Sequence, residues 1–139
     1  MHNTSLHHIL IVDDNQDSRY YMNSSFRELQ WDDNIKLIES ASRMLQYLEA
    51  LAHTATSPTL ILLNSNLQLI SCEEVMTHLK NHSRFRNIPI IVYSSDMNEA
   101  QSSKLQALGA LSCLKKQDGK SESKKLAEYI KQLTINHSN

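Results

Sequence analysis

Five short apolar segments alternate with five segments of helical periodicity, and this alternation constrains the fold more than any other feature of the chain. The apolar segments lie in HHILIVDD, NIKLIES, TLILL, IPIIVYSS and LSCLKK, and the helical ones in DSRYYMNSSFREL, SRMLQYLEALAH, CEEVMTHLKNH, NEAQSSKLQALGA and SESKKLAEYIKQL. Strands that alternate with helices indicate a parallel sheet covered by helices on both faces. Because such crossovers are right-handed, the sequence predicts a doubly wound, five-stranded α/β sheet.

Local signals place the ends of these elements. Either Asp17 or Ser18 can cap the start of the first helix, since short polar side chains accept hydrogen bonds from free N–H groups there. Gly109 is suited to end the fourth helix. The last helix is expected to end near Leu133, which leaves the tail TINHSN frayed.

The length suits a single compact domain. The chain has 139 residues, of which 40% are hydrophobic and 21% charged, so it can bury a core and stay soluble. Neither a linker nor a repeat interrupts the alternation. We therefore expect one domain over residues 1–139, with its core at about residues 6–134.

The charge balance and the absence of long apolar runs exclude several classes of protein. The net charge is -1, which gives no general attraction to nucleic acid or to an anionic membrane. Apolar runs stay far below the roughly 20 residues that cross a bilayer, and the N-terminus has no signal-peptide pattern. The two cysteines do not form a disulfide framework. Together these features predict a cytoplasmic protein.

Polar residues follow the predicted strands where parallel strands end at one edge of a sheet. The first strand ends in Asp13 and Asp14, the third in Asn64, the fourth in Tyr93, Ser94 and Ser95, and the fifth in Lys115 and Lys116. The carboxyl edge of an open parallel sheet is where such folds bind ligands. Adjacent acids suit a hard cation such as Mg²⁺, and a lysine opposite them can hold a phosphoryl group.

At this point the chain resembles the receiver domain of two-component response regulators, the CheY-like family with the flavodoxin-like (βα)5 fold. The matching pieces are LIVDD, LILLNSNL, IPIIVYSS and GALSCLKK, in the family's order, and the resemblance spans about residues 6–133. The resemblance implies that Asp13, Asp14 and Asn66 form a Mg²⁺ site and that Ser94 and Lys116 contact the phosphoryl group. The tyrosine before that hydroxyl, Tyr93, is interpreted as a core or rim residue.

The chain departs from the family at the positions that act in signalling. The phosphate-accepting aspartate is replaced by Asn64, and the aromatic residue that switches the domain is replaced by Cys113. Because an amide oxygen is neutral and its nitrogen lone pair is delocalised, Asn64 cannot form an acyl phosphate. With one anionic ligand fewer, Mg²⁺ binding is expected to be weak. The amide is expected instead to stabilise the fold by pairing with Asp13 or Lys116.

We therefore expect a non-enzymatic receiver that signals through protein contacts, with a sensor histidine kinase or another signalling protein as its partner. A second hypothesis is a phosphorylatable receiver whose acceptor was mutated or is restored by deamidation of Asn64. A third is a flavodoxin-like domain that binds a flavin or nucleotide. The acidic first loop, DDNQDS, and the 2 glycines in the chain argue against this third hypothesis, because a phosphate-binding loop needs free N–H groups. The oligomeric state is left open.

Overall fold

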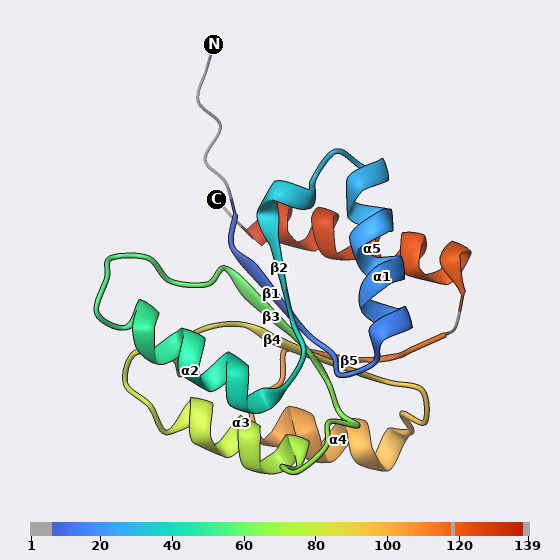
Figure 1. Cartoon of the computed structure of the whole chain (residues 1–139). Coiled ribbons are helices and arrows are strands. Elements are labelled where there is room, and N and C mark those ends of the chain that lie inside the picture. Colours follow the sequence, from blue (N-terminus) through green and yellow to red (C-terminus); the bar gives the residue numbers. More distant parts are fainter. Residues whose placement is uncertain (1–6, 118, 138–139) are drawn as a thin grey trace.

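The computed structural model describes residues 7–117 and 119–137, and it confirms the doubly wound sheet. All strand pairs are parallel, and the five strands lie side by side in the order β2-β1-β3-β4-β5 (Figure 1). The order places the carboxyl ends of β1, β3 and β4 next to one another at the centre of one edge. The strands are β1 (Ile9–Val12), β2 (Ile35–Ile38), β3 (Leu60–Asn64), β4 (Ile90–Ser94) and β5 (Ser112–Lys115).

Five α-helices form two layers over the sheet. Helices α1 and α5 pack side by side on one face, and α2, α3 and α4 cover the other (Figure 1). A short 3-10 turn over Asp32–Asn34 precedes β2. The helices are α1 (Gln16–Glu28), α2 (Ala41–Leu51), α3 (Cys72–Lys80), α4 (Glu99–Ala107) and α5 (Lys120–His137).

The central strands are buried on both faces, as their continuous apolar sequences predict. Successive side chains of a strand point to opposite faces. In β1, accordingly, Leu10 and Val12 join the core under α2, α3 and α4, whereas Ile9 and Ile11 join the core under α1 and α5. The hydroxyl-bearing ring of Tyr93 belongs to the second core.

Two predicted helix boundaries are wrong: the start of α1 and the end of α5. Helix α1 is capped by Asn15, whose side chain accepts a 2.8 Å hydrogen bond from the backbone N–H of Ser18. Neither Asp17 nor Ser18 is the cap, because the helix begins one residue before Asp17. Helix α5 continues to His137, past the predicted end at Leu133, and the buried Thr134 donates a hydrogen bond to the Ile130 carbonyl within it. The rest of the tail lies outside the described residues.

Candidate functional site

The sheet brings the predicted polar residues to one edge. Asp13 directly follows β1, Asn64 and Ser94 are the last residues of β3 and β4, and Lys116 follows β5. In the strand register Asn64 pairs with Tyr93. Asp13, Asn64 and Ser94 are all buried, so the centre of this edge is a polar site largely withdrawn from water.

The carboxylate of Asp13 is the centre of a network that we call the Asp13 cluster. It comprises the carboxylate and the groups that donate to it, from Asn15, Ser18, Asn64, Tyr93 and Lys116. Oδ1 accepts from the Asn15 backbone N–H at 3.0 Å and from the Asn64 side-chain amide at 3.0 Å. Oδ2 accepts from the Ser18 hydroxyl at 2.5 Å, the Tyr93 hydroxyl at 2.5 Å and the Lys116 ammonium at 3.1 Å. The donors come from four different segments of the chain.

The cluster keeps a buried charge ionised. Burial of Asp13 raises its pKa, but hydrogen bonds from Ser18, Tyr93 and Asn15, together with the charge of Lys116, outweigh burial and bring the pKa below its ordinary value. The pKa of the Tyr93 phenol is raised well above its ordinary value by burial and by the neighbouring carboxylate. Tyr93 therefore stays protonated and acts as a donor.

Both the nitrogen and the oxygen of the Asn64 side-chain amide form hydrogen bonds within the site. Its nitrogen donates to Asp13, and its oxygen accepts a 3.1 Å hydrogen bond from the backbone N–H of Asn66. The amide thus pairs with Asp13, one of the two partners proposed from the sequence. An ionised carboxylate can only accept hydrogen bonds, so an aspartate at this position could not replace the bond to Asp13.

A second group of residues surrounds the hydroxyl of Ser94, and we call it the Ser94 cluster. It comprises Ser94, Asn66 and Asp96. The Ser94 hydroxyl donates to the carboxylate of Asp96 and accepts a 3.3 Å hydrogen bond from the Asn66 side chain. The bond from Ser94 lowers the pKa of Asp96. Ser94 is buried, but Asn66 and Asp96 are exposed.

The donor set does not fit a divalent cation in this arrangement. A carboxylate offers about four lone-pair positions, and five donors already contact that of Asp13. The half-exposed Asp14 accepts a 3.3 Å hydrogen bond from the backbone N–H of Gln68. Within residues 7–117 and 119–137, no group of three or more His, Cys, Asp or Glu residues is placed to hold a metal. A cation at Asp13 would have to displace donors that the fold supplies.

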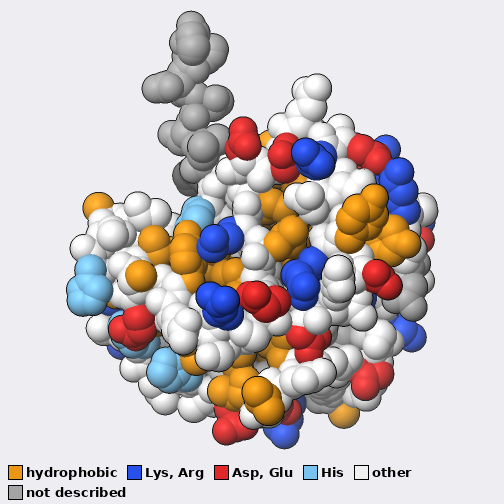
Figure 2. Space-filling view, in the orientation of Figure 1, with side chains coloured by type: hydrophobic (Ala, Val, Ile, Leu, Met, Phe, Trp, Pro, Cys, Tyr) orange, Lys and Arg blue, Asp and Glu red, His pale blue; other side chains and the backbone are white. Residues whose placement is uncertain are grey.

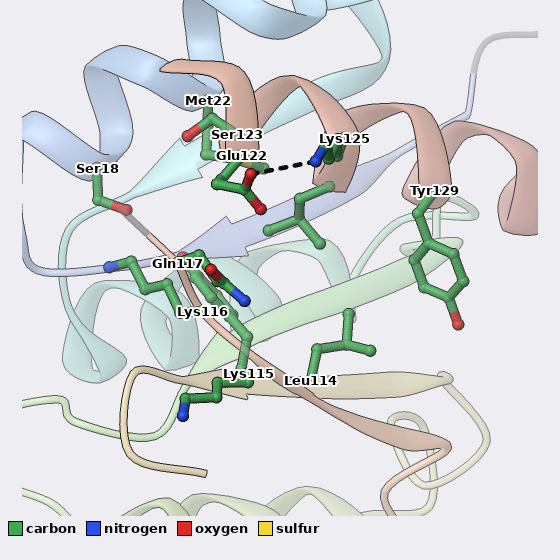
Figure 3. A pocket seen from close by; sticks show the side chains of 12 residues that line it. Ser18, Met22, Leu114, Lys115, Lys116, Gln117, Glu122, Ser123, Lys125 and Tyr129 are labelled. Carbon is green, nitrogen blue, oxygen red and sulfur yellow. Dashed lines mark hydrogen bonds and ion pairs between the residues drawn. The ribbon is translucent and has the colours of Figure 1, made fainter. Parts of the chain in front are cut away.

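A cleft of about 260 Å³ opens beside the Asp13 cluster, between α1, the end of β5 and α5 (Figure 3). Ser18 and Lys116 lie at one end of the cleft, and Tyr129 lies at the other. The ammonium of Lys125 is paired with Glu122 at 3.3 Å. Of the Asp13 cluster, the cleft exposes Ser18 and Lys116, while the carboxylate of Asp13 itself is fully buried.

Comparison with protein families identifies the family of the chain. The response regulator receiver domain family matches residues 9–130, nearly the whole chain. The chain belongs to this family. Receiver domains are the signalling domains of two-component systems and are generally not enzymes. No curated protein matches the sequence.

Solved structures of receiver domains agree with this assignment. The phosphorylated cyanobacterial phytochrome response regulator RcpA has a TM-score of 0.84 and 20% identity, over 97% of this chain and 98% of that chain. The Mn²⁺-bound response regulator Rcp1 has a TM-score of 0.77 and 19% identity, over 94% and 96% of the two chains. The chemotaxis response regulator CheY4 of Vibrio cholerae has a TM-score of 0.72 and 14% identity, over 91% and 99%. At these identities the likeness shows the fold alone.

In this receiver domain the predicted switch position is occupied by a small, half-buried thiol. Cys113 packs against the core beneath α2, α3 and α4, and its sulfur lies 3.8 Å from the Ser102 carbonyl oxygen. Burial raises the pKa of the Cys113 thiol. The role of Cys113 as the position of a missing aromatic switch stays a prediction.

Four residues of the site were not assigned to it from the sequence. They are Asn15, Ser18, Tyr93 and Asp96. The interpretation of Tyr93 as a core residue holds for its ring, which is 1% exposed, but it omits the hydroxyl. A buried tyrosine needs a partner for that hydroxyl, and this requirement was the available signal. Asp13 lies two strands away, which the strand order alone reveals.

Proposed function

We propose that this receiver domain signals through protein contacts without aspartyl phosphorylation. Asn64, which occupies the acceptor position at the end of β3, carries the proposal. Its amide has no nucleophilic oxygen anion, and both of its ends are hydrogen-bonded within the site. The neighbouring carboxylate of Asp13 is surrounded by donors, so it is not free to take over as a nucleophile.

The partner is a sensor histidine kinase or another signalling protein. Acidic and basic side chains are interspersed over the face shown in Figure 2, and the net charge of the chain is -1. These features support a protein partner and argue against nucleic acid or an anionic membrane. In the described part of the chain, no helix has the length and hydropathy to span a membrane.

The cellular location follows from the signalling role and from the thiols. The cysteines of the described chain are unpaired: Cys72 is buried and Cys113 is half-buried. Burial raises the pKa of the Cys72 thiol to about 12, which keeps it protonated and unreactive. Unpaired cysteines fit a reducing compartment and support a cytoplasmic location.

Divalent cations bind this receiver domain weakly, with a dissociation constant in about the millimolar range or poorer. Mg²⁺ dehydrates reluctantly and depends on the number of carboxylates that it meets. The three residues assigned to the cation from the sequence are Asp13, Asp14 and Asn66. Asp13 is saturated with donors, and the Asn66 side chain is bonded to Ser94. A cation would therefore compete with bonds that the folded chain already makes.

A flavodoxin-like ligand-binding domain is disfavoured by the first loop as well as by the family. The N–H of Asn15 and the hydroxyl of Ser18 both donate to Asp13, so neither is available to a phosphate group. A colourless purified protein would argue further against a bound flavin. The alternative is a phosphorylatable receiver whose acceptor was mutated to asparagine or is restored by deamidation of Asn64. Sequencing the gene and measuring the intact mass of the purified chain test it.

The decisive experiment is treatment with a small phosphodonor and Mg²⁺, followed by measurement of the intact mass. The native chain should gain no acid-labile phosphoryl group. The variant Asn64→Asp is treated in parallel to show whether the carboxylate alone restores phosphorylation, and a receiver domain with an intact acceptor is the positive control. Phosphate on the β3 peptide of the native chain would contradict the proposal. Phosphate on Asp13 or Asp14 would show that the nucleophile had moved.

A further inference from the structure

The hydroxyl of Tyr93 joins strands that are not neighbours in the sheet. Tyr93 is on β4 and Asp13 follows β1, while β3 lies between these two strands. The hydroxyl nevertheless reaches the Asp13 carboxylate at 2.5 Å, across 80 residues of sequence. Both side chains are buried, with 1% and 0% of their surfaces exposed. The bond is therefore a fixed link across the centre of the site.

The link is supported by one cationic donor and one neutral amide donor. The Lys116 ammonium contacts the same carboxylate oxygen at 3.1 Å and lies 5.4 Å from the centre of the Tyr93 ring. The amide of Asn64 supplies a donor to the other oxygen. A divalent cation would neutralise and bridge the carboxylate in the same way, but here each contact is made by the chain.

We infer that Tyr93 and Asn64 act in place of a divalent cation, so that Asp13 anchors the ends of β1, β3, β4 and β5 in one arrangement that does not depend on metal. Tyr93 is the positioning residue of this anchor. The inference goes beyond the absence of an acceptor, because it states that restoring the acid at position 64 alone does not restore a metal site. Displacing Tyr93 would leave a buried hydroxyl without a partner, and this opposes cation binding.

The inference is tested by titrating Mg²⁺ into the purified chain and following heat or NMR shifts. The native chain, Asn64→Asp, Tyr93→Phe and the double variant are compared. Phenylalanine keeps the buried ring and removes only the donor. Asn64→Asp should bind more tightly than the native chain, but the double variant should bind at least about tenfold more tightly than Asn64→Asp, a difference of about 1.4 kcal/mol.

Tyr47→Phe is the matched control, because the Tyr47 hydroxyl also makes a short side-chain bond, 2.6 Å from His8 Nε2, on another part of the molecule. This variant should leave the cation affinity unchanged. Equal affinities of Asn64→Asp and the double variant would overturn the inference, as would submillimolar binding by the native chain. Phosphorylation is not measured, so this test and the test of the proposed function fail independently.

Thermal unfolding gives a second readout that does not need the double variant to fold. Millimolar Mg²⁺ should raise the unfolding temperature of the native chain and of Tyr47→Phe only slightly and to the same extent. Tyr93→Phe alone should gain clearly more from Mg²⁺, because the Asp13 carboxylate has lost one of its five donors. An equal gain for the native chain and for Tyr93→Phe would overturn the inference.

Discussion

The Asp13 cluster and the Ser94 cluster lie side by side at the same edge of the sheet, but they are built differently. Asp13, Asn64 and Tyr93 have 0%, 4% and 1% of their surfaces exposed. Ser94 is equally buried, but both of its side-chain partners, Asn66 and Asp96, are exposed. Water can replace the partners of Ser94, whereas it cannot reach the buried Asn64 and Tyr93 that donate to Asp13.

The difference indicates which part of the receiver site is structural in this chain. Hydrogen bonds gain strength where water is excluded, and a buried polar group that loses its partner is costly. Asp13, which the family resemblance assigns to the cation, is thus held as part of the core. Ser94, which the resemblance assigns to the phosphoryl group, is a buried hydroxyl whose side-chain partners are exposed. The predictions below test this contrast, in order of decreasing effect.

Asp13→Ala should have the largest effect on stability. The change leaves the Lys116 ammonium, of which 16% of the side-chain surface is exposed, and the buried Tyr93 hydroxyl without their acceptor. Removing one member of such a pair destabilises a fold by about 3–5 kcal/mol. Urea denaturation measures the loss. Asp96→Ala, in the Ser94 cluster, is the control and should change the denaturation midpoint little. Equal losses of stability in the two variants would contradict the difference between the two clusters.

Asn64→Asp should come next, at about 3 kcal/mol without divalent cations. It removes a donor to Asp13 and places a second carboxylate about 3 Å away, although Lys116 offsets part of the repulsion. The loss should shrink at acidic pH, where one of the two carboxyl groups takes up a proton. Asn66→Asp makes the same chemical change at an exposed position and should cost clearly less. An Asn64→Asp variant as stable as the native chain would show that the site rearranges to accommodate the second carboxylate.

Tyr93→Phe should destabilise the fold by about 1.5 kcal/mol, which is typical of a lost hydrogen bond to a charged group. Tyr47→Phe should cost about half as much, because the Tyr47 hydroxyl bonds a neutral imidazole near the surface. Chemical denaturation of the two variants in parallel measures the difference. If Tyr47→Phe loses more stability than Tyr93→Phe, the hydrogen bond to Asp13 is not the more stabilising of the two.

Acid should weaken the native chain through Asp13. Its pKa is lower in the folded state than in the unfolded chain, so the stability that it contributes is present above the unfolded pKa of about 3.9. That contribution is lost as the pH falls through the lower, folded pKa, at about 1.4 kcal/mol for each unit of pKa difference. Asp13→Asn should remove this part of the pH dependence, which lies below about pH 5. An unchanged slope would mean that other carboxyl groups dominate acid unfolding.

Ser94→Ala should have the smallest effect. The hydroxyl is buried, but its acceptor Asp96 lies on the surface and is solvated when the bond is lost. We expect a denaturation midpoint indistinguishable from that of the native chain. A loss as large as that of Tyr93→Phe would show that the two clusters act as one network, joined through Asn66 and Asn64.

The amino-acid sequence by itself determined the five-stranded α/β sheet and which residues reach its carboxyl edge. Apolar runs that end in Asp13, Asn64 and Ser94 specify both, because the alternation of strands and helices leaves few topologies. The sequence also determined that the position predicted to be the phosphate acceptor holds an amide. These are properties of residue type and order along the chain.

Only the tertiary structure decided what the polar residues do for one another. The Tyr93 hydroxyl reaches Asp13 across β3, and Ser18 turns its hydroxyl to the same carboxylate instead of capping α1. The Tyr93 contact depends on the strand order, which joins residues 80 positions apart in sequence. The Ser18 contact joins residues only five positions apart, but it depends on how the first turn of α1 lies against the end of β1. Hydrogen bonding is directional over about 3 Å, so local sequence patterns cannot specify such partners.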